Sequence, residues 1–322
     1  MAQKIPERDL IHIFSRYSSM KPAGIEAFLT EKKVYADTPA WIKFIDKSLM
    51  LLGVIFSVAG IIFFFAYNWQ DMHKFVKLAL VQGLLITAVM VVVLSRLDLL
   101  IRNLILLGAS LLTGALFALF GQIYQTGADA YDFFLGWTIF IVLWTVVSGF
   151  APLWLLLTGL INITVVLYAE QIAGDWSAPL VYCILFVVNT ALYVSLALPG
   201  KTLLLTEVPK WFSNTLAAAA VTCSTISIVS GIIYRYDTAW YISFILVLLA
   251  YITALVYSFK SRKVFHLFIV PLSVIIIVAG FLVDTAKGND TLVFFIVSLF
   301  IVSSVSVLIS QILKLNRAWN GR

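Results

Sequence analysis

The residues best suited to chemistry lie in one polar stretch of the chain, GQIYQTGADAYD, which runs from Gly121 to Asp132. It contains no lysine or arginine and separates two strongly apolar runs. Hard cations prefer carboxylate and amide oxygens as ligands, and paired carboxylates can act as acid and base on a lipid headgroup. The candidate ligand-binding side chains are Gln122, Tyr124, Gln125, Asp129 and Asp132.

A structural role explains the same stretch. Asp132 can cap a helix that begins at Phe133, and Gly127 permits the turn before it. Asp129 and Asp132 share a face only if the segment between them is helical. Three alternatives therefore stay open for this loop: a structural cap, a ligand or ion site, and an enzyme site at the outer leaflet. No catalytic residue is assigned.

The elements that must position this loop are membrane helices. Only 12% of the residues are charged and 62% are hydrophobic, whereas soluble domains carry about 25% charged residues. Apolar runs of about 20 residues are long enough to cross a bilayer. We therefore predict an all-α polytopic membrane protein surrounded by lipid, and the net charge of +6 does not indicate nucleic-acid binding. The ten predicted spans are 47–67, 75–95, 103–121, 133–149, 152–169, 178–198, 213–233, 239–259, 264–283 and 290–312.

The orientation follows from the distribution of lysine and arginine. With the N-terminus in the cytoplasm, 18 of the 22 basic residues fall on the cytoplasmic side and four on the outer side. Cytoplasmic loops of membrane proteins carry the excess of basic residues. Both termini are therefore predicted in the cytoplasm and the 121–132 loop on the outer face of a cytoplasmic (inner) membrane.

Three regions are predicted along the chain. Residues 1–44 form a short soluble helical region, with one helix starting near Pro6 and a second over Ala23–Lys33. A third helix begins at Thr38, with Pro39 in its first turn, and leads into the first span. Residues 45–170 and 171–322 each hold five spans, and 171–322 ends in a cytoplasmic tail.

The predicted spans carry no charged residue near their middle. Intramembrane charges are costly and usually functional, so a mid-membrane carboxylate is excluded, whereas a polar, uncharged path is not. Among the amides inside spans, Gln82, Asn162 and Asn189 lie in the second, fifth and sixth spans. Such side chains form hydrogen bonds between helices that contribute about 0.6 kcal/mol on average. They are therefore pathway or packing amides.

Small residues predict close helix packing at two places. Gly108, Gly114 and Gly121 recur at nearly two helical turns and form one stripe on the third span. The seventh span, 213–233, is rich in serine, threonine and alanine. Small residues of this kind let neighbouring helices approach closely.

Sequence motifs of common enzymes and metal sites are missing. The chain has no phosphate loop and no GxGxxG, HExxH or GxSxG motif. Its three histidines are isolated, and Cys183 and Cys223 lie inside apolar runs. No metal site or disulfide framework is predicted.

The loop motif carries a resemblance. Residues 121–129, together with Phe134-Leu135-Gly136-Trp137, Leu153-Trp154 and Asn68-Trp69, resemble the bacterial membrane proteins called "domain of unknown function 2157" over roughly residues 10–170. The resemblance implies a protein of the bacterial inner membrane. It also suggests a membrane-protein partner, such as one that carries a GDYxxLxY motif. It assigns no cofactor and no catalytic role.

Transport or binding of a small solute or ion through the outer-face cluster is the preferred hypothesis. A scaffold or sensor subunit of a larger envelope complex is the alternative, and a membrane enzyme is less favoured. Two five-span halves of opposite orientation would suit a carrier, but the sequence shows no internal repeat. A cleft from Tyr124 and Asp129 towards Gln82 and Asn162 would favour transport, and a sealed bundle would favour the scaffold.

Overall fold

The structure is a computed structural model that describes residues 24, 26, 38–67, 72–124, 127, 129–197, 208–234, 237–285 and 290–320. The helix predicted near Pro6 lies outside these residues. Of the predicted helix Ala23–Lys33, only residues 24 and 26 are described, and both are helical.

Within these ranges the chain forms ten long helices and no strand, and all ten are long and apolar enough to cross a membrane. A helix suits lipid because all its backbone groups are bonded within the segment. The predicted all-α fold with ten spans is therefore confirmed. The helices are α3 (Thr38–Tyr67), α4 (Lys74–Leu94), α5 (Leu99–Tyr124), α6 (Ala130–Ser148), α7 (Ala151–Tyr168), α8 (Ala178–Ala197), α9 (Lys210–Tyr234), α10 (Thr238–Ser261), α11 (Val264–Thr285) and α12 (Asp290–Asn320).

Two boundaries show how local chemistry sets the helix ends. Gly149 adopts φ 56° and ψ 28° and ends α6 in the left-handed conformation that glycine tolerates. Helix α7 starts two residues later, with Pro152 in its first turn, so the predicted tight hairpin is confirmed. Helix α3 has 30 residues and is about 45 Å long. It joins the predicted third helix and the first span into one element.

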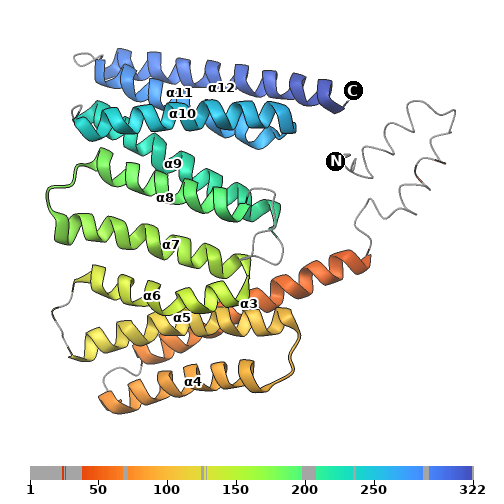
Figure 1. Ribbon diagram of the computed structural model, residues 1–322, viewed down its shortest axis with the longest axis vertical. Coiled ribbons are helices and arrows are strands. Elements are labelled where there is room, and N and C mark those ends of the chain that lie inside the picture. Colours follow the sequence, from red (N-terminus) through yellow and green to blue (C-terminus); the bar gives the residue numbers. More distant parts are fainter. Residues whose placement is uncertain are drawn as a thin grey trace.

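The helices pack mainly against their neighbours in the chain. Figure 1 shows α4 to α12 stacked side by side in nearly chain order. Helix α3 packs on α5, and α9 packs on both α8 and α11. No pair with substantial contact joins α3, α4 or α5 to α8–α12 among the described residues. The division at residue 170 stays a prediction.

The two ends of the array differ in charge. We call the end where α5, α7, α9 and α11 begin the basic end, because it carries Arg96, Lys260, Arg262 and Lys314. The opposite end, called the acidic end, carries the carboxylates Asp129, Asp132, Glu170, Asp175, Asp237 and Asp284. Figure 1 places the C-terminus at the basic end, on the same side as the start of α3.

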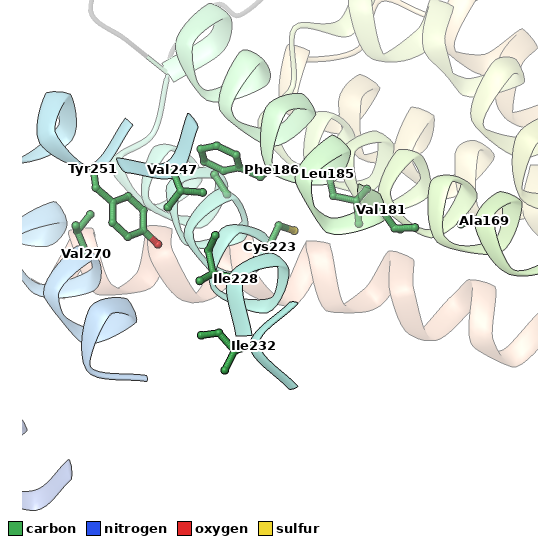
Figure 2. Close-up of a cluster of buried hydrophobic side chains, with 11 residues drawn as sticks. Ala169, Val181, Leu185, Phe186, Cys223, Ile228, Ile232, Val247, Tyr251 and Val270 are labelled. Atoms are coloured by element: carbon green, nitrogen blue, oxygen red, sulfur yellow. The ribbon is translucent and has the colours of Figure 1, made fainter. Parts of the chain in front are cut away.

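The largest apolar core lies between α8, α9, α10 and α11. Figure 2 shows its side chains converging around Cys223 and Ile228 of α9. A second core joins α6, α7, α8 and α9, and a small third one joins α4 and α5. Other helices hardly cover α3 and α12. In the most apolar 18-residue stretch of each, only 6% and 0% of the residues are buried. In a membrane, lipid chains cover such faces.

Trp137 of α6 packs directly on a glycine of α5. The indole N–H of Trp137 donates to the Ser110 carbonyl at 2.7 Å, and a Cβ on Gly114 would lie 2.6 Å from this ring. The predicted glycine stripe is therefore confirmed there. It is also confirmed at Gly108, whose Cβ would meet Val54 of α3 at 3.2 Å. At Gly121 a Cβ would meet no atom of another described segment within 4 Å.

Candidate functional site

The loop residues singled out from the sequence lie at the surface of the acidic end. Gln122 and Tyr124 are exposed on the last turn of α5. Asp129 is exposed immediately before α6, and Asp132 is exposed in the first turn of that helix. Gln125 lies outside the described residues. No hydrogen bond joins the side chains of the four that the structure describes.

The predicted cap at Asp132 is wrong by one turn. Helix α6 begins at Ala130 rather than Phe133, so Asp129 occupies the N-cap position and its side chain makes no capping bond. The side chain that satisfies this end is Gln171, whose Oε1 accepts from the Tyr131 amide at 2.8 Å. The sequence could not reveal this cap, because Gln171 is 40 residues away along the chain.

Gln171 is placed by a short π-helix, η1 (Ala169–Ala173), which extends α7. Next to it, the Tyr168 ring lies between two others. Its centroid is 5.2 Å from that of Tyr131 and 5.3 Å from that of Trp176. Aromatic residues of this kind gather at membrane interfaces. The acidic end of α6 and α7 is therefore held by one cap and an aromatic cluster.

The three predicted pathway or packing amides lie in different surroundings. Gln82 is exposed on α4, which packs on α5. Asn162 of α7 and Asn189 of α8 form a reciprocal pair, with Nδ2–Oδ1 distances of 3.1 and 2.6 Å. The structure therefore does not bring Gln82 and Asn162 together, and it unites Asn162 with Asn189.

All polar hydrogens of the asparagine pair are used. Asn162 Nδ2 also donates to the Thr158 carbonyl at 2.7 Å, and Asn189 Nδ2 to the Leu185 carbonyl at 2.8 Å. Asn189 is fully buried. Buried amides are stable only when they are paired in this way. The Cys223 Sγ of α9 lies 3.8 Å from Asn189 Nδ2, so the pair touches three helices.

A second buried polar group lies at the same depth, between α9, α10 and α11. The Tyr251 hydroxyl is 2.8 Å from Ser224 Oγ and 2.6 Å from Ser273 Oγ. Thr225 Oγ1 completes the group at 2.5 Å from Ser273 Oγ. All four side chains are buried. Figure 2 shows the Tyr251 hydroxyl directed from α10 towards α9.

Further polar contacts follow towards the acidic end. The Ser227 hydroxyl donates to the Pro179 carbonyl at 2.8 Å and lies 3.0 Å from Ser243 Oγ. Beyond it, Ser177 Oγ is 2.5 Å from Asp237 Oδ2. The other oxygen of Asp237 caps α10 by accepting from the Trp240 amide at 2.7 Å.

Towards the basic end, the Tyr193 hydroxyl of α8 lies 2.9 Å from Nε2 of the buried His266 of α11. Lys263 Nζ then donates to the Tyr257 hydroxyl at 3.0 Å. We call the series of contacts from Ser177 to His266 the polar seam, and the Lys263–Tyr257 contact lies beyond its end. The seam consists of Ser177, Asp237, Ser227, Ser243, Ser224, Thr225, Tyr251, Ser273, Tyr193 and His266, and the asparagine pair adjoins its middle.

Three polar atoms on the helices of the seam are buried without a partner among the described residues: Thr190 Oγ1, Ser258 Oγ and His266 Nδ1. All three lie in the half of the bundle nearer the basic end. An unpaired buried polar group costs about 1–3 kcal/mol. The seam therefore has hydrogen-bonding capacity that its own side chains do not use.

The seam favours neutral, hydrogen-bonding chemistry. The members in the middle of the seam carry hydroxyl groups and no formal charge. They are Ser243, Ser224, Thr225, Tyr251, Ser273 and Tyr193. Within the described part of the chain, no group of three or more His, Cys, Asp or Glu side chains is placed to hold a metal ion. Hydroxyls both donate and accept hydrogen bonds, which suits a polar, uncharged ligand.

Ten apolar helices around a buried polar interior define the class: a polytopic membrane protein. Residues 25–154 match the model of a family described as a predicted membrane protein (DUF2157), so the predicted resemblance is confirmed over that range. The matched range includes the 121–132 loop and ends in the first turn of α7, before the polar seam. No curated protein and no solved structure matches the chain.

Proposed function

We propose that the protein transports a small, uncharged polar solute across the membrane along the polar seam. One observation supports this most. Hydrogen-bonding side chains recur at successive depths between α8, α9, α10 and α11, half-buried at Asp237 near the acidic end and buried from Ser243 to His266 except for the half-buried Tyr193. Apolar side chains would pack these helices equally well, so such a complete series favours a pathway.

The charge of the seam supports a neutral solute. A charged group near the membrane centre is costly, and carriers of ions usually place charged partners there. The middle of this seam offers hydroxyls and, beside them, the asparagine amides. Thr190, Ser258 and His266 add buried atoms that have no partner among the described residues, and a passing solute would satisfy them by hydrogen bonding.

Opening of the seam requires α11 to move. Its hydroxyls now bond one another, so the bundle is closed at Ser273. Pro271 lies inside α11, two residues before Ser273. Proline lacks the backbone N–H and interrupts the helical ladder, which makes this turn the weakest part of the helix. Bending at Pro271 would separate Ser273 from Tyr251.

The proposal predicts that Tyr251→Phe, which removes a hydroxyl and leaves the ring, lowers flux at least about tenfold. A lost hydrogen bond to an otherwise buried group contributes about 1.4 kcal/mol or more to the barrier, and this corresponds to a factor of ten. The full chain in proteoliposomes would be tested with glycerol and urea by stopped-flow light scattering, and with neutral amino acids by radiolabel uptake. Tyr241→Phe, on the exposed surface of the same helix, is the matched control.

The same assay tests the outer loop. If flux falls in Asp129→Asn/Asp132→Asn and not in Tyr251→Phe, the pathway runs through the loop rather than the seam. This is the hypothesis that the sequence favours.

Proteoliposomes that pass none of the probes would contradict transport. They would favour the alternative, a scaffold whose uncovered α3 and α12 bind a membrane partner such as a GDYxxLxY-motif protein. Crosslinking from α12 in native membranes would then have to capture that partner.

We also propose that the protein lies in a bacterial inner membrane with both termini in the cytoplasm. The basic end would then face inward, as the positive-inside rule requires. Alkaline phosphatase fused after Arg322 is expected to be inactive, and the same enzyme inserted at Gly127 is expected to be active. A green fluorescent protein fused after Arg322 should fluoresce. The reverse pattern would overturn the orientation.

A further inference from the structure

We propose that the basic end of α10, α11 and α12 binds the headgroup of an anionic phospholipid. Five cations gather there, all of them exposed. The α10–α11 turn supplies three and the end of α12 supplies two. They are Lys260, Arg262, Lys263, Lys314 and Arg317. This inference does not depend on the proposed transport or on the orientation.

The two groups of cations come from segments that the fold brings together. Helix α12 packs on α11. The rings of Phe259 on α10 and Trp319 on α12 meet edge to face, with centroids 6.3 Å apart. Lys314 and Arg317 precede Trp319 by five and two residues. They therefore lie at the same end of the array as the α10–α11 turn.

The aspartates of α11 and α12, Asp284 and Asp290, lie at the opposite end of these helices from the cations. Residues 238–283 and 291–322 contain no aspartate or glutamate. Basic residues between helices at a membrane surface attract anionic headgroups, and an arginine binds phosphate through two parallel hydrogen bonds. The charge of the patch is thus complementary to a phosphodiester.

The surface beside the cations identifies the ligand as a lipid rather than free phosphate. Ile309 and Leu313 of α12 are 45% and 50% exposed, and they lie within about two turns of the cations on the same helix. An acyl chain covers such a surface while its headgroup pairs with the cations. Trp319 stands at the depth where aromatic residues meet the headgroup layer.

The backbone at Arg262 adds a second observation. Its φ of 51° makes it the single non-glycine with positive φ among the residues that the structure describes. This position ends α10, where the Arg262 and Lys263 amides both bond to the Ser258 carbonyl, and glycine is the favoured residue there. The chain therefore holds a guanidinium at the tip of the turn against the local backbone preference.

The test uses the full chain, purified from vesicles with equal amounts of phosphatidylglycerol and phosphatidylcholine, and counts retained lipids by native mass spectrometry. We expect retained phosphatidylglycerol to exceed phosphatidylcholine. Arg262→Gly should lower that preference about fivefold, and Lys260→Gln/Arg262→Gly/Arg317→Gln should lower it further, by about fivefold for each cation. Because glycine suits the backbone at position 262, thermal unfolding of Arg262→Gly should occur at the wild-type temperature or above.

Lys43→Gln/Lys47→Gln is the matched control. These lysines lie at the same end of the array on α3, with Asp46 in the same helical turn, so the lipid preference should persist. Equal loss in the control and the triple variant would overturn the site and reveal general surface attraction. Retention of phosphatidylglycerol by the triple variant would also overturn it. Displacement of the lipid by inorganic phosphate alone would show that the ligand is the free anion.

Discussion

Replacing Gly231 by alanine is expected to lower the free energy of unfolding by about 1–3 kcal/mol, or more, because the new methyl group has no room. A Cβ at this position would overlap Cδ1 of Trp240. The indole cannot move aside freely. Its N–H donates to the Ile228 carbonyl at 3.0 Å, and its ring stacks on Phe244 at 5.4 Å.

The backbone of Trp240 is fixed as well. Its amide is bonded to Asp237, and Asp237 is bonded in turn to Ser177 of the α7–α8 connection. The alanine methyl group must therefore displace the start of α10 or the half of α9 nearer the acidic end. Both belong to the largest apolar core, so the strain is expected to spread rather than to relax locally.

The measurement is equilibrium unfolding of the purified protein in mixed micelles, followed by far-ultraviolet circular dichroism. Gly159→Ala is the control, because a Cβ at that position in α7 would meet no atom of another described segment within 4 Å. It should gain about 0.5–1 kcal/mol, since alanine is a better helix former than glycine. Gly231→Ala/Trp240→Phe should recover part of the loss, because the smaller ring makes room. A Gly231→Ala protein as stable as the wild type would refute the close packing.

The spans could be predicted from the sequence because their cause is local. A stretch of about 20 apolar residues has one stable form in lipid, and flanking residues such as Gly149 and Pro152 set its ends. The length of α3 was predicted in the same way, because the helix expected from Thr38 leads into the first span and ends at Tyr67. Lys43, Asp46 and Lys47 make its first turns too polar for a span, although nothing in them ends a helix.

The candidate site could not be predicted in the same way, because its contacts join residues far apart in the chain. Asn162 and Asn189 are separated by 27 residues and Thr225 and Ser273 by 48. Each pairing depends on the rotation of two helices about their axes. The serines of α9 were predicted to permit close packing, but the sequence did not reveal that Tyr251 and Ser273 would meet them.

The structure explains why the 121–132 loop is conspicuous in the sequence. Asp129 and Asp132 stand out in the sequence because the surrounding residues are apolar. In the structure they are exposed at a helix start, where a carboxylate is favoured by the helix dipole. A polar residue at the end of a span needs no partner, whereas one in the middle does. The less conspicuous hydroxyls inside the spans are therefore more informative about a pathway.

Replacing Asn189 by leucine is expected to lower the free energy of unfolding by about 1–3 kcal/mol, because it leaves the half-buried Asn162 amide without its partner. Asn162→Leu should have a similar effect. In Asn162→Leu/Asn189→Leu both amides are gone and the two side chains can pack, so part of the loss should return, with a coupling energy of about 0.5–3 kcal/mol. Gln82→Leu is the control. Gln82 is exposed on α4, so its replacement should cost nothing.

The double variant also separates packing from transport, which unfolding alone cannot do. If the asparagine pair only holds α7 against α8, the double variant should recover both stability and solute flux. If the pair belongs to the pathway, it should recover stability while flux stays low, because leucine offers no hydrogen bond to a polar solute. A double variant less stable than the sum of the two single losses would contradict both explanations. It would mean that the amides bond to Thr158, Leu185 and Cys223 more strongly than to each other.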